Sequence, residues 1–510
     1  MATRDRRFPH QILVIGTAVF AGLWAVVRAC VQSVTIDEAD TYLFWVARTS
    51  PAHWEAASNN HVLNSLLMRL CTSLFGASQF TIRLPALAGA AIYIGAAYGF
   101  CRLMTREWKL QWLVLVCLVF NPFVFDYLVA ARGYSLAMAF LMAALVIAAQ
   151  AKQDDLCGQP RLPLERAAAA CSACAALSFA ANFSFAFVDG AAMLAIFWWF
   201  CRGLRGTRAR LRMLTASTIP GFIVTLFLSA SVVMQFPRGE LHYGAWSLGE
   251  MFGSVVRDSL YELNPQIVNP LLLGLMDRPK HFLLPLLAAC AIWRMMATGR
   301  RRSPPSGLHD VWLRSLGGVL SATLGMALLA HWLAFRRFRV LLPMDRTALF
   351  VAVIGTMLIG LAAGLPAASR DWSRTGLLAM LFAVSIYYLG CLRLSYFKEW
   401  RWDADVNKVY PVLVDYSRTY GIANVVSEWR YTSALGFYRA LAGPGPIPQS
   451  PEIRSSIPIP EDGQMYVLDI GFEADAVRRL GLRVVYRGDT TDVVVAVQPD
   501  VLRRNPGAIR

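Results

Sequence analysis

Long apolar stretches recur along the chain up to about residue 396, and they constrain its fold more than any other feature. The first, "QILVIGTAVFAGLWAVVRACV" at 11–31, carries a single charge. A helix needs about 20 such residues to cross the hydrocarbon core of a bilayer. Because 56% of the residues are hydrophobic and only 16% are charged, a soluble globular protein is excluded. The pattern predicts an α-helical multi-pass membrane protein.

The apolar stretches predict about 11 transmembrane helices and one orientation. The first stretch lacks a small-residue cleavage site, so we interpret it as a retained span with "RDRR" on its cytoplasmic side. The loops "CRLMTREWK", "CRGLRGTRARLR" and "RMMATGRRRS" then fall inside, as the positive-inside rule expects. The predicted spans lie near residues 11–32, 81–101, 111–129, 134–150, 165–181, 183–200, 214–234, 281–297, 314–335, 346–366 and 376–396.

The tail from 397 to 510 lacks long apolar runs and predicts a second, smaller domain. "NVVSEW", "MYVLDI", "LRVVYRG" and "DVVVAVQP" are typical of β-strands. "DADVNKVYPVLVDYSRTYG" and "EADAVRRLG" favour helices, and "AGPGPIPQSPEIRSSIPIPEDG" favours a loop. We therefore expect a transmembrane domain over 1–396 and an extracytoplasmic α/β domain over 397–510.

Composition also bounds the partners of the chain. The net charge is +16, but the arginines lie in short loops between spans, so we expect no nucleic-acid partner. Nearly all of the ten cysteines lie in or beside apolar spans, and the one CxxC pair, Cys171 and Cys174, has no second pair. We assign neither a disulfide nor a zinc site.

The first outer loop, 33–80, opens on a cluster of acids in "SVTIDEADTYLFW". Asp37 or Glu38, held at the water–lipid boundary, can act as a general base or bind a cation. Alternatively, these acids cap the next helix, with Thr35 or Asp37 as its N-cap. Trp45 and Trp54 are expected to anchor the loop at headgroup depth.

A later outer loop, "FRRFRVLLPMDR" at 335–346, carries four arginines against the positive-inside bias. Either they bind an anionic ligand such as a phosphate, or they pair with lipid headgroups and nearby acids. In the outer loop 236–280, His242, Tyr243 and Trp246 are candidates for stacking on a sugar.

Three motifs that follow one another along the chain resemble those of a known protein family. "TIDEADTY", "NNHVLNSLLMRLCTSLFGASQFTIRLPALAG" and "NPFVFDYLVAARGYSLAMAFLMAAL" resemble the GT-C superfamily of integral-membrane glycosyltransferases, which includes protein mannosyltransferases and the lipid A aminoarabinose transferase. The resemblance implies a GT-C-like fold and transfer of a sugar from a polyprenyl-phosphate donor. It covers the first 150 residues or so well and the rest of the chain in outline.

The same resemblance implies roles for particular residues. Asp37 matches the catalytic carboxylate that activates the acceptor, and Glu38 is its partner. Arg132 and Tyr134 match an "AR-Y" motif, while Asp126 supplies a charge one turn earlier. His61 stands where the family often has a His-Pro-Pro motif, although the prolines are absent here. The candidates for holding the lipid phosphate are Arg132, Arg336, Arg337, Arg339 and Arg346, with Arg346 favoured, whereas Arg83 is expected to be structural.

These observations predict a membrane glycosyltransferase, a hexosyl- or pentosyltransferase that acts on the outer face of the membrane. Its partners would be a polyprenyl-phosphate sugar, a lipid, glycan or protein acceptor, and membrane lipids. The bacterial inner membrane is the expected location. The sequence predicts no metal ligands and no firm cofactor, and it leaves open whether the enzyme uses a divalent cation. The alternatives are a multi-pass transporter or lipid flippase, which would favour internal repeats, and a membrane scaffold that presents its tail.

Overall fold

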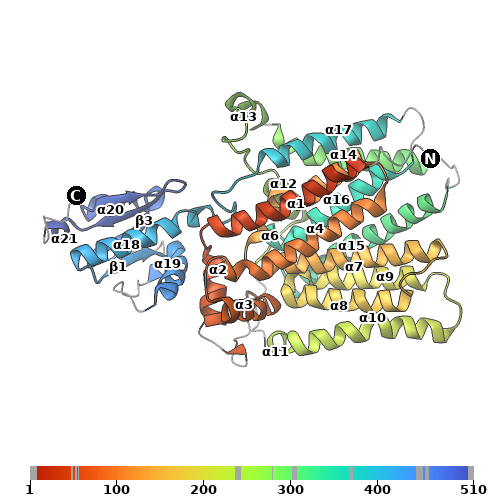
Figure 1. The fold of residues 1–510 in the computed structure, drawn as a ribbon, viewed down its shortest axis with the longest axis horizontal. Coiled ribbons are helices and arrows are strands. Elements are labelled where there is room, and N and C mark those ends of the chain that lie inside the picture. Colours follow the sequence, from red (N-terminus) through yellow and green to blue (C-terminus); the bar gives the residue numbers. More distant parts are fainter. Residues whose placement is uncertain are drawn as a thin grey trace.

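The computed structural model describes residues 8–47, 50–51, 54, 57–235, 243–277, 279–300, 307–366, 371–443, 452–453 and 459–503. A long helical bundle makes up most of the molecule, and a small domain containing a β-sheet lies at one end of it (Figure 1). Helix α1 (Phe8–Val31) begins at the far end of the bundle and ends beside this domain (Figure 1). We call the end of the bundle next to the small domain the domain end.

The bundle has the spans that the apolar pattern predicts. Among the described residues, ten helices are long and apolar enough to cross a membrane, and a bent pair brings the number to as many as eleven. The straight spans contain α1, α4 (Leu84–Met104), α7 (Tyr134–Leu156), α8 (Leu164–Ala181), α9 (Ala186–Cys201), α10 (Thr207–Leu228), α14 (Lys280–Arg300), α15 (Leu308–Phe338), α16 (Leu349–Gly364) and α17 (Trp372–Gly390). The chain is a multi-pass membrane protein.

The third predicted span is the bent one. It consists of α5 (Trp108–Val119) and α6 (Pro122–Val129), which meet at 62°. Pro122 cannot continue a helix but suits its first position, and Asn121 caps the new helix by accepting a hydrogen bond from Phe123 N at 3.0 Å. The bend therefore has a local cause, and it gives α6 its own direction at the domain end.

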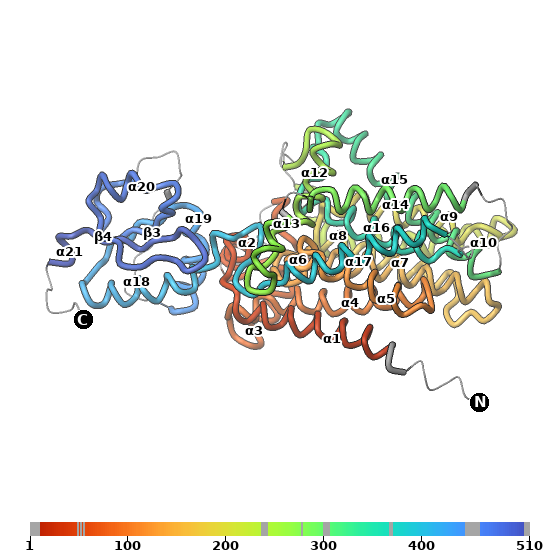
Figure 2. The backbone as a smooth tube through the Cα atoms, turned by 90° about the horizontal axis from the view of Figure 1, so that it is seen from above, coloured from red at the N-terminus to blue at the C-terminus, as the bar shows by residue number. Residues whose placement is uncertain are grey.

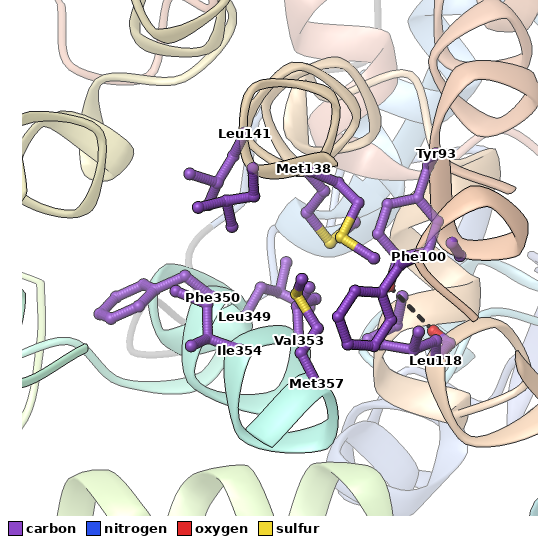
Figure 3. Close-up of a cluster of buried hydrophobic side chains, with 14 of the residues drawn as sticks. Tyr93, Phe100, Leu118, Met138, Leu141, Leu349, Phe350, Val353, Ile354 and Met357 are labelled. Carbon is purple, nitrogen blue, oxygen red and sulfur yellow. Dashed lines mark hydrogen bonds between the residues drawn. The ribbon is translucent and has the colours of Figure 1, made fainter. Parts of the chain in front are cut away.

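The core of the bundle is apolar and lies between α4, α5, α7 and α16 (Figure 3). Phe100, Met138 and Met357 pack there, and the Tyr93 hydroxyl donates a hydrogen bond to the Leu118 carbonyl oxygen at 3.0 Å. The outer faces are apolar as well: Leu23 on α1 is 62% exposed and Phe227 on α10 is 81% exposed. Such faces suit contact with lipid rather than water.

The first loop contains three short helices that pack on the domain end. They are α2 (Ile36–Asp40), the π-helix η1 (Thr41–Ala47) and α3 (Val62–Phe75), and a 3-10 turn, η3 (Thr81–Arg83), precedes α4. The sequence suggested that Trp45 and Trp54 anchor the loop in lipid, and this prediction is wrong. Both are buried, and the Trp54 indole donates a hydrogen bond to the Trp45 carbonyl oxygen at 2.9 Å.

The remaining helices of the bundle are short. They include η4 (Phe183–Phe185), α11 (Ala230–Val233), α12 (Leu248–Ser259), α13 (Pro270–Asp277) and η5 (Asp345–Ala348). An isolated bridge joins Ala245 to Leu342 and so ties the segment before α12 to the segment before η5.

The small domain is a five-stranded mixed sheet with helices. The strand order is β2-β1-β3-β5-β4, with β1 parallel to β2 and β3 and with β5 antiparallel to β3 and β4. The strands are β1 (Val425–Glu428), β2 (Glu452–Ile453), β3 (Met465–Asp469), β4 (Arg483–Arg487) and β5 (Val493–Val497). The helices are η6 (Arg401–Asp403), α18 (Val406–Tyr420), α19 (Trp429–Ala442), α20 (Ile470–Arg479) and α21 (Pro499–Arg503).

All four strands that the sequence predicts are present, whereas β2 and α19 were not predicted. Strand β2 lies inside the segment 442–463 that was predicted to be a loop, and 444–451 and 454–458 of that segment lie outside the described residues. The core strands β3 and β5 are buried along their whole length because helices cover them.

Helix α19 holds the domain against the bundle (Figure 2). The Tyr438 hydroxyl accepts a hydrogen bond from Val34 N at 3.0 Å and donates one to Gln79 Oε1 at 2.9 Å. The Phe437 ring meets Tyr42 edge to face, with 5.2 Å between ring centroids. The segment between α17 and α18 adds a second contact, because Asp403 Oδ2 accepts a hydrogen bond from Ile36 N at 2.8 Å.

Candidate active site

The acidic cluster folds into α2 through its first residues. Thr35 is the N-cap: its hydroxyl accepts a hydrogen bond from Glu38 N, and the Glu38 carboxylate accepts one from Thr35 N. This reciprocal capping box needs Glu38 at the third position of the helix. The neighbouring side chain of Asp37 points elsewhere, since residues one apart on a helix do not share a face.

Glu38 is fully buried, and its carboxylate is fully occupied. Arg83 donates to Oε1 at 2.8 Å and to Oε2 at 2.7 Å, and Ala131 N adds a bond of 2.7 Å to Oε1. Arg83 also binds the carbonyl oxygens of Gln32 and Ser33, at 2.7 Å each, so it closes the end of α1. Glu38 and Arg83 thus have the bonding of a structural pair rather than of groups open to a substrate.

Asp37 lies where arginines from distant parts of the chain meet. Its side chain is 17% exposed. Arg346 Nη1 lies 3.1 Å from Oδ2, and Arg132 Nε lies 3.7 Å from the same oxygen. Asp37 therefore combines access from outside with two cations beside its carboxylate.

Arg346 connects Asp37 to a second acid. The same Nη1 atom lies 2.8 Å from Glu399 Oε1, and the guanidinium stacks 5.0 Å from the ring centroid of Tyr243. Burial, together with the negative charges of Asp37 and Asp126, raises the pKa of Glu399 to about 8. One guanidinium nitrogen thus serves two carboxyl groups, one from the first loop and one from the segment after α17.

Arg132 belongs to the turn between α6 and α7. It donates to Thr41 Oγ1 at 2.9 Å and to the Asn59 side chain, while its buried Nε has no hydrogen-bond partner among the described residues. Gly133 follows in the left-handed conformation, with φ +71°. A Cβ at Gly133 would collide with the Ala181 carbonyl oxygen and lie 2.9 Å from His61 Cβ, so glycine is needed there.

His61 and Tyr134 lie beside this turn. The centroids of their rings are 5.4 Å apart, and the ring centroid of Tyr134 is 4.8 Å from that of Tyr127. Both ring nitrogens of His61 are buried without a hydrogen-bond partner among the described residues. Burial and the charges of Arg132 and Arg346 lower the pKa of His61 well below its usual range. The imidazole is therefore neutral at pH 7 and is not a third cation of the site.

Both carboxylate oxygens of Asp126 are bound by other residues, so Asp126 is not a second free acid beside Asp37. Arg28 Nη2 donates to Asp126 Oδ1 at 2.6 Å, and Lys398 N donates to Oδ2 at 2.6 Å. The contact fixes the segment after α17 against α1 and α6. Lys398 in turn pairs with Asp258 of α12.

A cavity of about 200 Å³ adjoins these groups. Its wall is made by α6, α12, η5 and the segment after α17. The lining residues are Phe123, Asp126, Tyr127, Arg257, Asp258, Asp345, Lys398 and Glu399. Since Glu399 also binds Arg346, the cavity lies next to the Asp37–Arg346 pair.

The structure separates the four arginines of 335–346. Arg346 lies in η5 against Asp37, whereas Arg336, Arg337 and Arg339 are exposed at the end of α15. Arg336 stacks on Trp332 and Arg337 on Phe338, and none of the three makes an ion pair with a described residue. Of the sugar-stacking candidates, Tyr243 lies on Arg346, Trp246 is 68% exposed, and His242 is outside the described residues.

Sequence reasoning missed several residues of the site, above all Lys398 and Glu399. They belong to "YFKEWRWDAD", a charged and aromatic run directly after the last span. This run falls at the expected domain boundary and was assigned to the small domain, although it packs into the bundle. Its mixture of charges and aromatic residues at a predicted membrane surface is the signal that was available.

Within the part of the chain that the structure describes, no group of three or more His, Cys, Asp or Glu side chains is arranged to hold a metal ion. The acids of the site are instead paired with arginine or lysine: Asp37 with Arg346, Asp126 with Arg28, and Asp258 with Lys398.

Comparisons with known proteins find matches among solved structures but none among sequences. No family model matches the chain, and no curated protein matches it. The crystal structure of ArnT from Cupriavidus metallidurans in the apo state matches with a TM-score of 0.42 and 15% identity, over 96% of this chain and 97% of that chain. ArnT bound to undecaprenyl phosphate matches with a TM-score of 0.38 and 13% identity, over the same shares. The cryo-EM structure of the arabinofuranosyltransferase AftD from Mycobacteria matches with a TM-score of 0.45 and 15% identity, over 95% of this chain and 40% of that one.

Proposed function

We propose that this chain is a glycosyltransferase that moves a sugar from a polyprenyl-phosphate donor to an acceptor at the membrane surface. The observation that carries the proposal is the position of Asp37: a partly exposed carboxylate, 3.1 Å from Arg346 and 3.7 Å from Arg132, beside a polar cavity at one end of a membrane-spanning bundle. The sequence motifs around Asp37 and Arg132 resemble those of membrane glycosyltransferases, and they agree with this chemistry.

In the proposed reaction, the acceptor hydroxyl or amine attacks the anomeric carbon of the sugar. A bond forms from the acceptor oxygen or nitrogen to that carbon, and the bond from the carbon to the phosphate oxygen breaks. The acceptor proton passes to the Asp37 carboxylate, which acts as general base. The leaving group is the polyprenyl phosphate, which takes the electron pair of the broken bond.

Arg346 and Arg132 are proposed to hold the lipid phosphate. Negative charge grows on the phosphate oxygen as the bond to the sugar breaks, and fixed guanidinium groups stabilise this charge in the transition state. The buried Nε of Arg132 lies near Asp37 but has no hydrogen-bond partner among the described residues, so it can donate to an anion. Arg336, Arg337 and Arg339 are exposed at the end of α15, and we propose that they contact lipid headgroups.

The other candidate residues take supporting roles in this proposal. Glu38 holds the α2 turn through Arg83, and Asp126 fixes the segment that carries Glu399. Tyr134 and His61 pack against each other beside Arg132, and burial lowers the pKa of His61 so that its ring is neutral. We propose that the domain end faces the outside of a bacterial inner membrane, because the arginine-rich segment 202–212, where α9 ends and α10 begins, lies at the opposite end of the bundle (Figure 1).

Asp37→Asn tests the proposal. Transfer from a radiolabelled polyprenyl-phosphate sugar by purified protein in lipid nanodiscs is expected to fall at least about 100-fold, because general-base catalysis contributes about 10²–10⁴-fold. The matched control is Asp475→Asn, at a carboxylate that is 92% exposed on the small domain, and it should transfer as well as wild type. Full transfer by Asp37→Asn protein with a wild-type melting temperature would contradict the proposal.

The transporter and flippase alternatives predict a different product. Wild-type protein in sealed vesicles would then move the labelled lipid or solute across the membrane without forming a new glycosidic bond. Chromatography of the label after incubation distinguishes the two outcomes, because only transfer changes the molecule that carries the sugar.

A further inference from the structure

A larger cavity lies at the end of the bundle away from the small domain. Its volume is about 630 Å³, and the spans α4, α7, α15 and α16 surround it. Helix α4 begins at the domain end, beside the Glu38–Arg83 pair, and its 21 residues at about 1.5 Å each carry it about 30 Å to this cavity. The proposed transfer reaction takes place at the other end of the bundle and does not use the cavity.

The charged side chains that line the cavity are basic. Arg102 and Arg106 line it, and none of the described lining residues is an acid. The Arg102 guanidinium stacks on Tyr98, 5.8 Å from the ring centroid, and neither arginine makes an ion pair with a described residue. Both side chains are exposed, so a ligand can approach them. Guanidinium groups without an acidic partner are suited to hold the oxygens of a phosphate.

The acids next to lining residues in the sequence have other partners. Glu107 pairs with Arg374, Asp154 accepts a hydrogen bond from Gln150, Asp155 pairs with Lys152, and Asp310 pairs with Arg314. These carboxylates therefore do not cancel the positive charge of the cavity, which is left to attract an anion.

Two aromatic side chains attach α15 to the other walls of the cavity. Trp312 is 1% exposed, and its indole donates a hydrogen bond to the Ala149 carbonyl oxygen of α7 at 3.1 Å. His309 Nε2 donates to the Met104 carbonyl oxygen of α4 at 3.3 Å, and the rings of His309 and Trp312 stack with 5.5 Å between their centroids. The cavity is therefore enclosed by helices that are bonded to one another.

The cavity also has an apolar side, which continues onto the outer surface of α15. Leu103, Leu156 and Leu308 line the cavity, and Leu308 is 61% exposed. Val311 lies three residues further along the same face of the helix and is 41% exposed. Guanidinium groups beside an apolar rim, at the end of membrane spans, suit a molecule that combines an anionic headgroup with hydrocarbon chains. The volume of the cavity falls within the roughly 300–1,000 Å³ of ligand sites.

We infer that this cavity binds the headgroup of an anionic phospholipid, in the leaflet at the end of the bundle away from the small domain. Arg102 and Arg106 are assigned to its phosphate, Gln153 to its hydroxyl groups, and Leu308 to the first carbons of an acyl chain. The lipid then joins α15 to α4 and α7 at this end. The site lies apart from Asp37, so the inference does not depend on the proposed function.

Native mass spectrometry of the full-length chain, stripped of lipid in detergent, tests the site. The probes are dioleoyl phosphatidylglycerol, which is anionic, and dioleoyl phosphatidylcholine, which has the same chains and no net charge. Wild type should bind one phosphatidylglycerol about tenfold more tightly than phosphatidylcholine, as one additional hydrogen bond to a charged group provides. Arg102→Gln/Arg106→Gln should lose this preference, and Arg106→Gln alone should lose part of it. An equal concentration of glycerol 3-phosphate, which has no chains, should not displace the lipid.

The matched control is Arg208→Gln/Arg210→Gln. It removes two exposed arginines from the first turn of α10, at the same end of the bundle but outside the cavity, and it should keep the preference (Figure 1). Melting temperatures without added lipid identify any variant that fails to fold, and the single variant then decides. Equal wild-type affinities for the two lipids, an unchanged preference in the Arg102→Gln/Arg106→Gln protein, or an equal loss in the control would overturn the inference. Displacement of the lipid by glycerol 3-phosphate would also overturn it and would assign the cavity to a soluble phosphate.

Discussion

At the scale of single residues, Asp37 and Glu38 show how neighbours acquire different roles. Both are acids in the same turn, but the capping box commits Glu38 to Thr35 N, and Arg83 neutralises it in the interior. Asp37 instead reaches Arg346, which lies 309 positions further along the chain. The first contact is local and the second depends on the whole fold, so their loss should have different consequences.

Glu38→Gln is expected to lower stability much more than Asp37→Asn does. The change leaves the fully buried Arg83 without a charged partner, and breaking a buried ion pair costs about 3–5 kcal/mol. Thermal unfolding of both variants in the same detergent measures the difference. Equal melting temperatures for the two variants would show that Glu38 is not the structural acid.

Glu399 should make the stability of the protein, and its binding of a lipid phosphate, depend on pH. Its carboxyl keeps its proton to about pH 8 in the folded state, whereas its ordinary pKa is 4.5. The folded state then binds more protons than the unfolded chain between these values, so the free energy of unfolding falls as pH rises from about 4.5 to about 8. Above pH 8 the new charge also competes for Arg346 and weakens binding of a lipid phosphate.

Glu399→Gln keeps an oxygen for Arg346 but cannot ionise. We expect this variant to bind decaprenyl phosphate equally well at pH 7 and pH 9, whereas wild type binds it more weakly at pH 9. The melting temperature of this variant should also change less with pH than that of wild type. A wild-type pH dependence in the variant would assign the effect to another group.

At the scale of elements, the bend between α5 and α6 and the turn before α7 build one wall of the site. Pro122 directs α6, which carries Asp126 and Tyr127, and Gly133 lets the chain reverse so that Arg132 reaches Asp37. These positions are short-range features of the sequence, but their effect is to aim side chains at partners from other helices.

Gly133→Ala tests the turn against a matched glycine. Gly158 has a similar φ of +68° but has open space around it, so Gly158→Ala should cost only about 1–2 kcal/mol for the left-handed conformation. Gly133→Ala adds a collision with Ala181 and displaces Arg132. Since misplacement by about 1 Å can reduce a rate about 100-fold, transfer should fall at least tenfold in this variant alone. Similar activities in both variants would contradict the assigned role of the turn.

At the scale of the molecule, the small domain supports the site from one side. Helix α19 packs on the loop that contains α2 through Phe437 and Tyr438, whereas Lys398 and Glu399 come from the segment between α17 and α18, which packs into the bundle. The domain thus braces the loop that carries Asp37, and we expect changes in this interface to reach the chemistry.

Tyr438→Phe is expected to loosen that brace. The change removes the hydrogen bonds that the hydroxyl makes with Val34 N and Gln79. Amide hydrogen exchange at residues 33–38 should therefore become faster. Sugar transfer should fall by about threefold to tenfold, because the lost hydrogen bonding is worth about 1 kcal/mol. Tyr420→Phe, at a ring that stacks on Tyr416 within the domain, is the control and should change neither measurement. Unchanged exchange in Tyr438→Phe would show that the brace lies elsewhere.

The sequence by itself determined the spans, the four principal strands and the position of Asp37 and Arg132 in recognisable motifs, because hydropathy, alternation and capping are properties of neighbouring residues. Only the tertiary structure decided that Glu38 is buried on Arg83, that Arg346 alone among the four arginines of its loop meets Asp37, and that Lys398 and Glu399 line the cavity. These pairings join residues from separate helices. Their geometry depends on how the spans pack, which no local pattern specifies.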